Sequence, residues 1–168
     1  VSTSGLVPQI RKLGQETNVA LAVSLHAPDD ELRNQLVPIN RQHPIAELLE
    51  ACWEYAEVTN AVGITFEYVM LAGVNDAESH ARGLVKLLAN RPAKLNLIPF
   101  NPFPGSHYRR SSGAALDRFR QILIDAGIMT ITRRTRGDDI AAACGQLAGQ
   151  VNNRVRVPLG TRLHEVTW

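Results

Sequence analysis

Apolar residues along this chain form short continuous runs that alternate with longer stretches of helical spacing. Short apolar runs rich in Val, Leu, Ile or aromatic residues are typical of buried strands. The chain has four of them, at residues 19–25, 63–71, 94–100 and 128–134. No hairpin turn joins consecutive runs, so the sequence predicts parallel strands connected by right-handed crossovers.

Three amphipathic helices are predicted in the stretches between the strands. The first covers residues 44–59, whose apolar positions fall on one stripe at helical spacing. Asn75, with Glu78 three residues later, has the pattern of a capping box and predicts the start of the second helix. The third covers residues 113–126, and Gly127 is expected to end it as the glycine that follows the helix cap.

This alternation of strands and helices predicts an α/β fold. The first five residues have no helix or hairpin pattern, and no element is predicted before the first strand. Four parallel strands cannot close a barrel, because eight strands need about 250 residues. The chain is therefore expected to form a small open sheet or to be a piece of a larger fold. Its core is predicted at residues 1–150, followed by a basic, mostly flexible tail at residues 151–168.

Composition narrows the class of protein. With 168 residues, 45% of them hydrophobic and 20% charged, the chain has the profile of a globular domain and not of a disordered one. Its two cysteines, Cys52 and Cys144, are too few for a disulfide-stapled secreted domain. No apolar run approaches the roughly 20 residues that span a bilayer, and no signal-peptide pattern is visible. A cytoplasmic location is expected.

Charge is unevenly distributed along the chain. Residues 1–105 contain 8 basic and 11 acidic side chains, whereas residues 106–168 contain 10 basic side chains, all of them Arg, and 5 acidic ones. Arg forms bidentate hydrogen bonds with phosphate and stacks on bases. The second region therefore suggests a nucleic-acid or other anionic partner, and a solvated basic surface is the alternative. The arginines that could form a phosphate-binding face are Arg109, Arg110, Arg118, Arg120, Arg133, Arg134 and Arg136.

Functional residues of parallel α/β folds lie at the carboxyl ends of the strands. Ser24 and His26 follow the first predicted strand with one residue between them, so in an extended chain both face the same side and suit a polar ligand pocket. Alternatively, Ser24 helps to cap a helix that begins at Asp29, and His26 bonds to a loop carbonyl. Asn101, held among prolines after the third strand, offers a donor and an acceptor that suit an adenine or amino-acid group. A turn-forming Asn is the alternative there.

The two cysteines differ in their surroundings. Cys144 lies among small residues that leave room for a substrate, which makes it a candidate nucleophile, and a core position is the alternative. Cys52 lies on the apolar stripe of the helix at residues 44–59 and is expected in the core. Two cysteines cannot form the three-thiolate site of an iron–sulfur cluster, and their neighbours do not resemble a zinc site. No metal site is therefore predicted in this chain.

Read together, six segments occur in the order seen in a known family. They resemble the dual-specificity RNA methyltransferases of the radical S-adenosylmethionine class, which methylate C2 of an adenosine in 23S ribosomal RNA and in some transfer RNAs. The likeness runs from Val1 to about Gln150. It rests on STSG at residues 2–5, SLHAP at 24–28, VPIN at 37–40, FEYVML at 66–71, LIPFNPFPG at 97–105 and RTRGDDIAAACGQL at 134–147.

The resemblance implies a fold, a cofactor and a reaction. The fold would be the C-terminal portion of a partial parallel α/β barrel of the TIM-like, radical S-adenosylmethionine type, and the full-length protein would hold a [4Fe–4S] cluster. In the family, one molecule of S-adenosylmethionine methylates a cysteine, and a radical made from a second molecule activates that methyl group for transfer to adenine. The methylated cysteine falls on Cys144. The S-adenosylmethionine contacts fall on Ser2, Ser24, Leu25, His26 and Asn101.

The resemblance also implies partners. Ribosomal 23S RNA, together with transfer RNA, would contact the arginine-rich region, no membrane partner is expected, and the full-length protein would be a monomer. The contacts with RNA fall on Arg109, Arg110, Arg133, Arg134 and Arg136.

The chain departs from the family pattern at its cysteines. It lacks the three-cysteine cluster motif and the second, resolving cysteine, and Cys52 is not a candidate for that role. We therefore expect the C-terminal part of such an enzyme, inactive alone. The alternatives are the antibiotic-resistance relative that methylates C8 of the same adenosine and a non-catalytic RNA-binding fragment.

Overall fold

The computed structural model of the chain describes residues 1–133, which contain a regular alternation of strands and helices. The elements are β1 (Ser2–Thr3), α1 (Val7–Glu16), β2 (Ala22–Ser24), α2 (Asp30–Leu36), the 3₁₀ helix η1 (Pro38–Arg41), α3 (Ile45–Val58), β3 (Ile64–Met70), α4 (Glu78–Leu87), β4 (Ala93–Pro99), α5 (Gly113–Asp125) and β5 (Met129–Thr132). Within these residues, no helix combines the length and the apolar character needed to cross a membrane.

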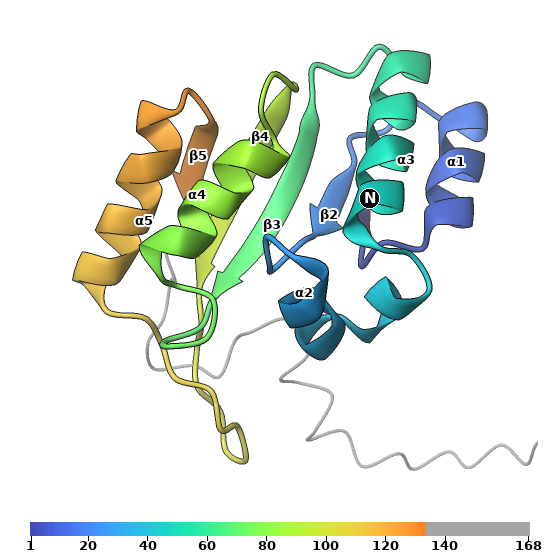
Figure 1. Cartoon of the computed structure of the whole chain (residues 1–168). Coiled ribbons are helices and arrows are strands. Elements are labelled where there is room, and N and C mark those ends of the chain that lie inside the picture. Colours follow the sequence, from blue (N-terminus) through green and yellow to red (C-terminus); the bar gives the residue numbers. More distant parts are fainter. Residues whose placement is uncertain (134–168) are drawn as a thin grey trace, which may run out of the picture. The chain divides into compact units, whose positions relative to one another are not determined.

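All five strands lie parallel in one sheet, in the order β1-β2-β3-β4-β5 (Figure 1). The predicted α/β class with parallel strands is confirmed, and strands that follow chain order are the arrangement of a TIM-like barrel. The expected number of four strands is wrong, because β1 adds a fifth at the edge, where Ser2 pairs with Ala22. Only two residues long and made of Ser and Thr, β1 has no apolar run that could reveal it.

The helices α1, α3, α4 and α5 cover one face of the sheet (Figure 1). Along β3, every second side chain is completely buried in the core, whereas Thr65, Glu67 and Val69 point to the opposite face and are partly exposed. Within residues 1–133 that second face carries no helix, and we call it the open face. By strand register it comprises Ser2, Ala22, Ser24, Thr65, Glu67, Val69, Lys94, Asn96, Ile98, Met129 and Ile131.

Helix α1 forms in a stretch for which no element is predicted from the sequence. It has Pro8 in its first turn, where a helix does not need the missing N–H. Ile10 and Gly14 lie on its buried side, and a Cβ atom on Gly14 would lie 3.1 Å from Cδ2 of Tyr55 in α3. Val7, Ile10 and Leu13 are spaced as on one face of a helix, so this stripe is a signal in the sequence from which α1 could have been predicted.

The ends of two helices test the predicted caps. Helix α4 begins at Glu78 with Ala77 as its N-cap, so the expected cap at Asn75 is wrong. Instead, Nδ1 of His80 accepts a hydrogen bond from the N–H of Ala77 (3.3 Å). The predicted end of α5 is confirmed, because Gly127 follows the helix cap with φ +79°, in the left-handed region.

Candidate cofactor site

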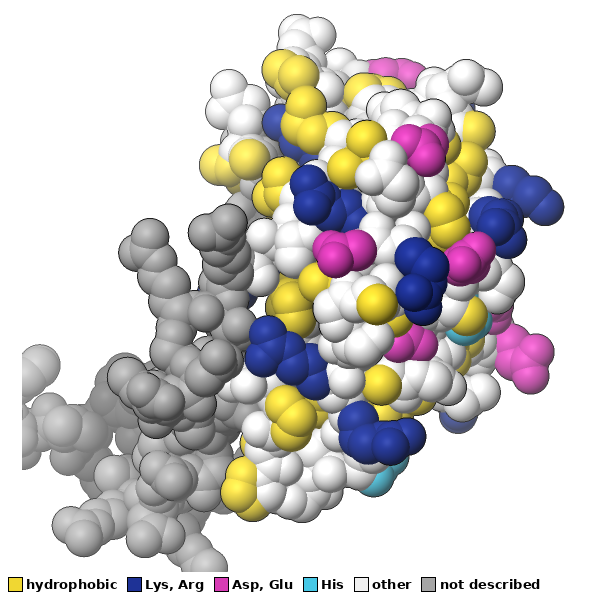
Figure 2. All heavy atoms as spheres, turned by 90° about the vertical axis from the view of Figure 1, so that its left-hand side faces the viewer, with side chains coloured by type: hydrophobic (Ala, Val, Ile, Leu, Met, Phe, Trp, Pro, Cys, Tyr) yellow, Lys and Arg dark blue, Asp and Glu magenta, His cyan; other side chains and the backbone are white. Residues whose placement is uncertain are grey.

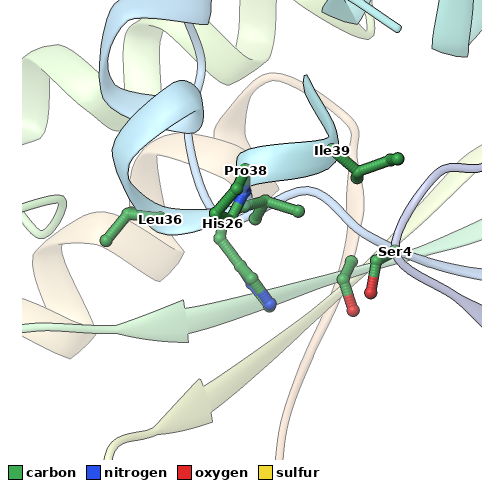
Figure 3. A pocket seen from close by; sticks show the side chains of 7 residues that line it. Ser4, His26, Leu36, Pro38 and Ile39 are labelled. Atoms are coloured by element: carbon green, nitrogen blue, oxygen red, sulfur yellow. The ribbon is translucent and has the colours of Figure 1, made fainter. Parts of the chain in front are cut away.

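The carboxyl end of β2 borders a hollow of about 350 Å³, which we call the β2 pocket (Figure 3). One side is formed by the strand ends, with Ser4 just after β1, Ser24 at the end of β2 and His26 two residues later. Residues 36–39, where α2 passes into η1, form the other side and are all apolar. Two hydroxyls and an imidazole opposite an apolar wall suit a ligand that has both polar and apolar parts.

The structure brings Ser24 and His26 together at this pocket, but by a geometry that differs from the predicted one. His26 has φ +60°, so the chain is not extended there. The alternative role of Ser24 as a helix cap is also wrong. Asp29 caps α2 itself, because its carboxylate accepts the N–H of Leu32 (2.9 Å).

His26 is uncharged at neutral pH. Its Nδ1 accepts a hydrogen bond from the backbone N–H of Val69 (3.2 Å), so the neutral ring has its proton on Nε2. Burial lowers the pKa of His26 to about 4, and the positive charge of Arg33 acts in the same direction, while a hydrogen bond with the backbone of Glu67 opposes both. The ring therefore presents one tautomer and no positive charge to the pocket.

The other predicted cofactor contacts lie at the strand ends but not on the pocket lining. Ser2 is exposed on the open face at the β1 edge. The side chain of Leu25 is completely buried in the core, and its carbonyl accepts a hydrogen bond from Nε of Arg33 (3.0 Å). Asn101 follows the end of β4 and is partly buried. Their roles as cofactor contacts stay predictions.

The predicted RNA-contacting arginines are only partly covered by the structure. Arg109 and Arg110, in the segment between β4 and α5, are exposed, and so is Arg133, directly after β5. Arg134 and Arg136 lie outside the described residues. On the side of the molecule that bears α5 and β5, Lys and Arg side chains are spread among Asp and Glu and form no continuous patch (Figure 2).

Three polar residues beside this edge of the sheet are not evident as functional in the sequence. Glu67 is on the open face in register with Ser24, so both side chains face the same side. Arg33 and Asn75 are completely buried and hydrogen-bonded to the strand ends. Apolar residues alternate with polar ones along 64–68, and this alternation could have placed Glu67 on the face of the sheet away from the core. Nothing local marks Arg33, and the local pattern at Asn75 is that of a helix cap.

The resemblance implies two cofactors, S-adenosylmethionine and a [4Fe–4S] cluster, and the described residues suit the first but not the second. On the open face, the amide oxygen of Asn96 is buried and has no hydrogen-bond partner within residues 1–133. A buried acceptor of this kind is positioned to accept a hydrogen bond from a ligand. In the same part of the chain, no group of three or more His, Cys, Asp or Glu side chains could hold a metal. The expected core position of Cys52 is confirmed, and burial raises the pKa of its thiol to about 12. These residues therefore do not fit an iron–sulfur cluster, and Cys144 lies outside them.

Solved structures similar to this chain include the two that follow, while no protein-family model matches the chain. One is a radical SAM methyltransferase from Sphaerobacter thermophilus, with 51% sequence identity and a TM-score of 0.83 over 87% of this chain and 43% of that one. The other is a domain of pyruvate-formate lyase-activating enzyme from Bacteroides vulgatus, with 19% identity and a TM-score of 0.63 over 80% of each chain. The second likeness shows the fold alone.

The fold is therefore that of an α/β chain built like part of a TIM-like barrel. At 51% identity, the first likeness is to a radical SAM methyltransferase, which supports the same general class of enzyme for this chain. The chain spans less than half the length of that methyltransferase.

Proposed function

We propose that this chain is part of an enzyme that methylates C2 of an adenosine in 23S ribosomal RNA and in transfer RNA, with S-adenosylmethionine as the methyl donor and Cys144 as the methylated residue. The similarity to a radical SAM methyltransferase supports the class of reaction. The single observation that carries the proposal for this chain is the β2 pocket. It is lined by Ser24 and His26, two residues of the SLHAP segment at which the family resemblance places contacts with S-adenosylmethionine.

In this proposal the β2 pocket binds part of S-adenosylmethionine. The hydroxyls of Ser4 and Ser24 bond to its ribose or amino-acid group, and residues 36–39 contact its apolar parts. The neutral state of His26 matters because S-adenosylmethionine has a positively charged sulfonium and an ammonium group. A protonated imidazole beside them would repel both.

The arginines near the ends of β4 and β5 are proposed to contact RNA phosphates. Arg109, Arg110 and Arg133 follow β4 and β5 in the sequence, and the β2 pocket likewise lies at the carboxyl end of its strand. Arg134 and Arg136 continue the run in the sequence. Phosphate contacts supply affinity without base specificity and position the RNA, so the arginines would hold an adenosine at the edge where the cofactor binds.

Nucleoside analysis in cells that express the intact gene encoding this chain tests the reaction. We expect mass spectrometry of 23S ribosomal RNA and transfer RNA to detect 2-methyladenosine, and we expect Cys144→Ala to abolish it. Cys52→Ala is the matched control, because Cys52 is buried in the core and does not line the pocket. Methylation that survives Cys144→Ala would contradict the role of this thiol.

The same measurement separates the alternatives. The antibiotic-resistance relative would give 8-methyladenosine in place of 2-methyladenosine. A non-catalytic RNA-binding fragment would give neither, and its RNA binding would survive Cys144→Ala.

The 168-residue chain alone is expected to be inactive. When it is reconstituted with iron, sulfide and S-adenosylmethionine, we expect no release of 5′-deoxyadenosine above background, because its two cysteines are too few to ligate the cluster. Measurable release would contradict this expectation.

A further inference from the structure

Three consecutive carbonyls at the end of β2 accept hydrogen bonds from buried side chains of two other segments. The carbonyls of Ser24 and Leu25 accept from Arg33 of α2 (2.8 and 3.0 Å). The carbonyl of His26 accepts from Asn75, which lies between β3 and α4 (2.9 Å). The turn that brings Ser24 and His26 to the β2 pocket is therefore held by side chains that do not themselves line the pocket.

Arg33 is completely buried, and its guanidinium joins three segments around the pocket. In addition to the turn, Nη2 donates to the carbonyl of Ser4 (2.9 Å), and Nη1 donates to Oδ1 of Asn40 in η1 (2.7 Å). Asn40 in turn donates to Asp30 (2.8 Å), so an amide connects the positive charge to a carboxylate. A buried guanidinium is costly unless its donors are used, so these acceptors must keep their positions.

Gly5 shows how closely the chain passes this guanidinium. A Cβ atom at this position would lie 3.2 Å from Nη2 of Arg33, and its φ of +110° is one that residues other than glycine rarely adopt. The backbone after β1 is therefore shaped to fit Arg33.

Asn75 holds the other part of the turn and is also completely buried. Its Nδ2 donates to the carbonyls of His26 (2.9 Å) and Val69 (2.7 Å), and its Oδ1 accepts the N–H of Leu71 (2.8 Å). His26 has φ +60°, a conformation that is uncommon for residues other than glycine and persists where the surrounding structure holds it. The hydrogen bond from Asn75 to the carbonyl of His26 helps to hold His26 in this conformation.

We propose that Arg33 and Asn75 are positioning residues that hold residues 24–26 in their ligand-binding shape before S-adenosylmethionine arrives. The inference rests on the proposed function of the β2 pocket. A turn that is already ordered loses less conformational entropy when a ligand binds, and this raises affinity. Loss of either side chain should therefore weaken binding more than an equal loss of stability elsewhere in the fold.

The test compares Arg33→Lys and Asn75→Ala with Tyr55→Phe in the 168-residue chain. Tyr55 is a buried residue of α3 whose hydroxyl donates to the carbonyl of Val19 before β2 (2.6 Å), so Tyr55→Phe removes a hydrogen bond away from the pocket. S-adenosylmethionine is titrated by NMR at a temperature where every variant is folded. We expect the dissociation constant to rise at least about tenfold in the first two variants and less than about twofold in the control.

A second readout follows the turn without a ligand. In the unaltered chain, burial lowers the pKa of His26 to about 4. When the turn opens to solvent, NMR titration should show this pKa rising toward 6.5, the ordinary value for histidine. The rise is expected even in Arg33→Lys, which keeps the positive charge. Tyr55→Phe should leave the pKa of His26 near 4, because a general loss of stability does not open the turn.

The outcomes separate the two claims. Variants of Arg33 and Asn75 that bind as tightly as Tyr55→Phe, with an unchanged His26 titration, would overturn the positioning role and leave the proposed function intact. No binding by the unaltered chain would overturn the cofactor role of the β2 pocket, and the His26 titration would then decide whether the turn is held. If Arg33→Lys does not fold, Asn40→Ala, which removes the acceptor of Nη1, is expected to weaken binding about threefold.

Discussion

The two edges of the sheet are built differently. At the β1–β2 edge, buried polar side chains of Arg33, Asn40 and Asn75 tie the strand ends together. At the opposite edge, β5 exposes Met129 (60%) and Ile131 (57%) on the open face. The first edge depends on hydrogen bonds of buried side chains, two of which, from Arg33 to Ser4 and from Asn75 to His26, join residues far apart in sequence. The second edge presents exposed side chains, which contribute little to folding. We therefore expect changes at the first edge to affect folding and ligand binding together, and changes at the second to affect binding alone.

The largest expected effect is the loss of Arg33. Arg33→Met leaves the carbonyls of Ser4, Ser24 and Leu25 without this donor, and unfolding in urea should show a loss of about 3 to 5 kcal/mol. Arg11→Met is the matched control, because Arg11 is an exposed arginine with an ion pair to a glutamate, and it should unfold at nearly the same urea concentration as the unaltered chain. Similar losses in both variants would contradict the contrast between buried and exposed polar contacts.

The pH dependence of stability is the next largest effect at the β1–β2 edge. The pKa of His26 is lowered by burial to about 4, against about 6.5 in an unfolded chain, so the unfolded state binds more protons between these values. The contribution of His26 is therefore complete above pH 6.5 and is lost as the pH falls toward 4, by up to about 3 kcal/mol.

Urea unfolding at several pH values, compared between the unaltered chain and His26→Asn, isolates this contribution. Asn tolerates the left-handed conformation of this position and does not titrate. The variant should lose less stability than the unaltered chain between pH 6.5 and 4. Equal losses would show that His26 is not held in its neutral form by the fold.

The longer strands and helices could be predicted because their own residues encode them. β3 and β4 alternate buried and partly exposed side chains, and their bounds agree with the predicted runs to within one residue at each end. β1 could not be found, because its pairing with β2 depends on residues about 20 positions away. By contrast, α1 could have been predicted from the helical spacing of Val7, Ile10 and Leu13, and its close approach to α3, through Gly14 and Tyr55, could not.

The candidate site was less visible in the sequence than the fold. Ser24 and His26 stand out because they follow a strand, but Arg33 lies in a polar helix and has the pattern of a solvent-exposed residue. Asn75 has the pattern of a helix cap, although its amide bonds to His26, 49 residues away in sequence. Buried polar residues of this kind are recognised only by their distant partners, which a local pattern does not contain.

The arginines after β4 and β5 should affect RNA binding with little effect on stability. Arg109→Gln and Arg133→Gln remove exposed charges, so we expect urea unfolding to change by less than about 0.5 kcal/mol. Each lost phosphate contact should reduce the slope of log affinity against log salt by about 0.7 to 0.9. RNA affinity measured at several salt concentrations checks the change in slope. Arg11→Gln is the control, because Arg11 lies in α1, on the other side of the molecule from β5. Unchanged slopes would contradict the proposal that these arginines contact RNA phosphates.

The smallest effect is expected at the exposed apolar positions of β5. Ile131→Thr keeps a β-branched side chain on the strand, and Ile131 is 57% exposed, so unfolding in urea should change by less than about 0.5 kcal/mol. Leu97→Thr, at a completely buried position of the neighbouring strand β4, should by contrast lose about 3 kcal/mol. A loss above about 1 kcal/mol in Ile131→Thr would mean that other atoms cover this side chain in solution. The β5 edge would then be as important for folding as the β1–β2 edge, and the contrast between the two edges would fail.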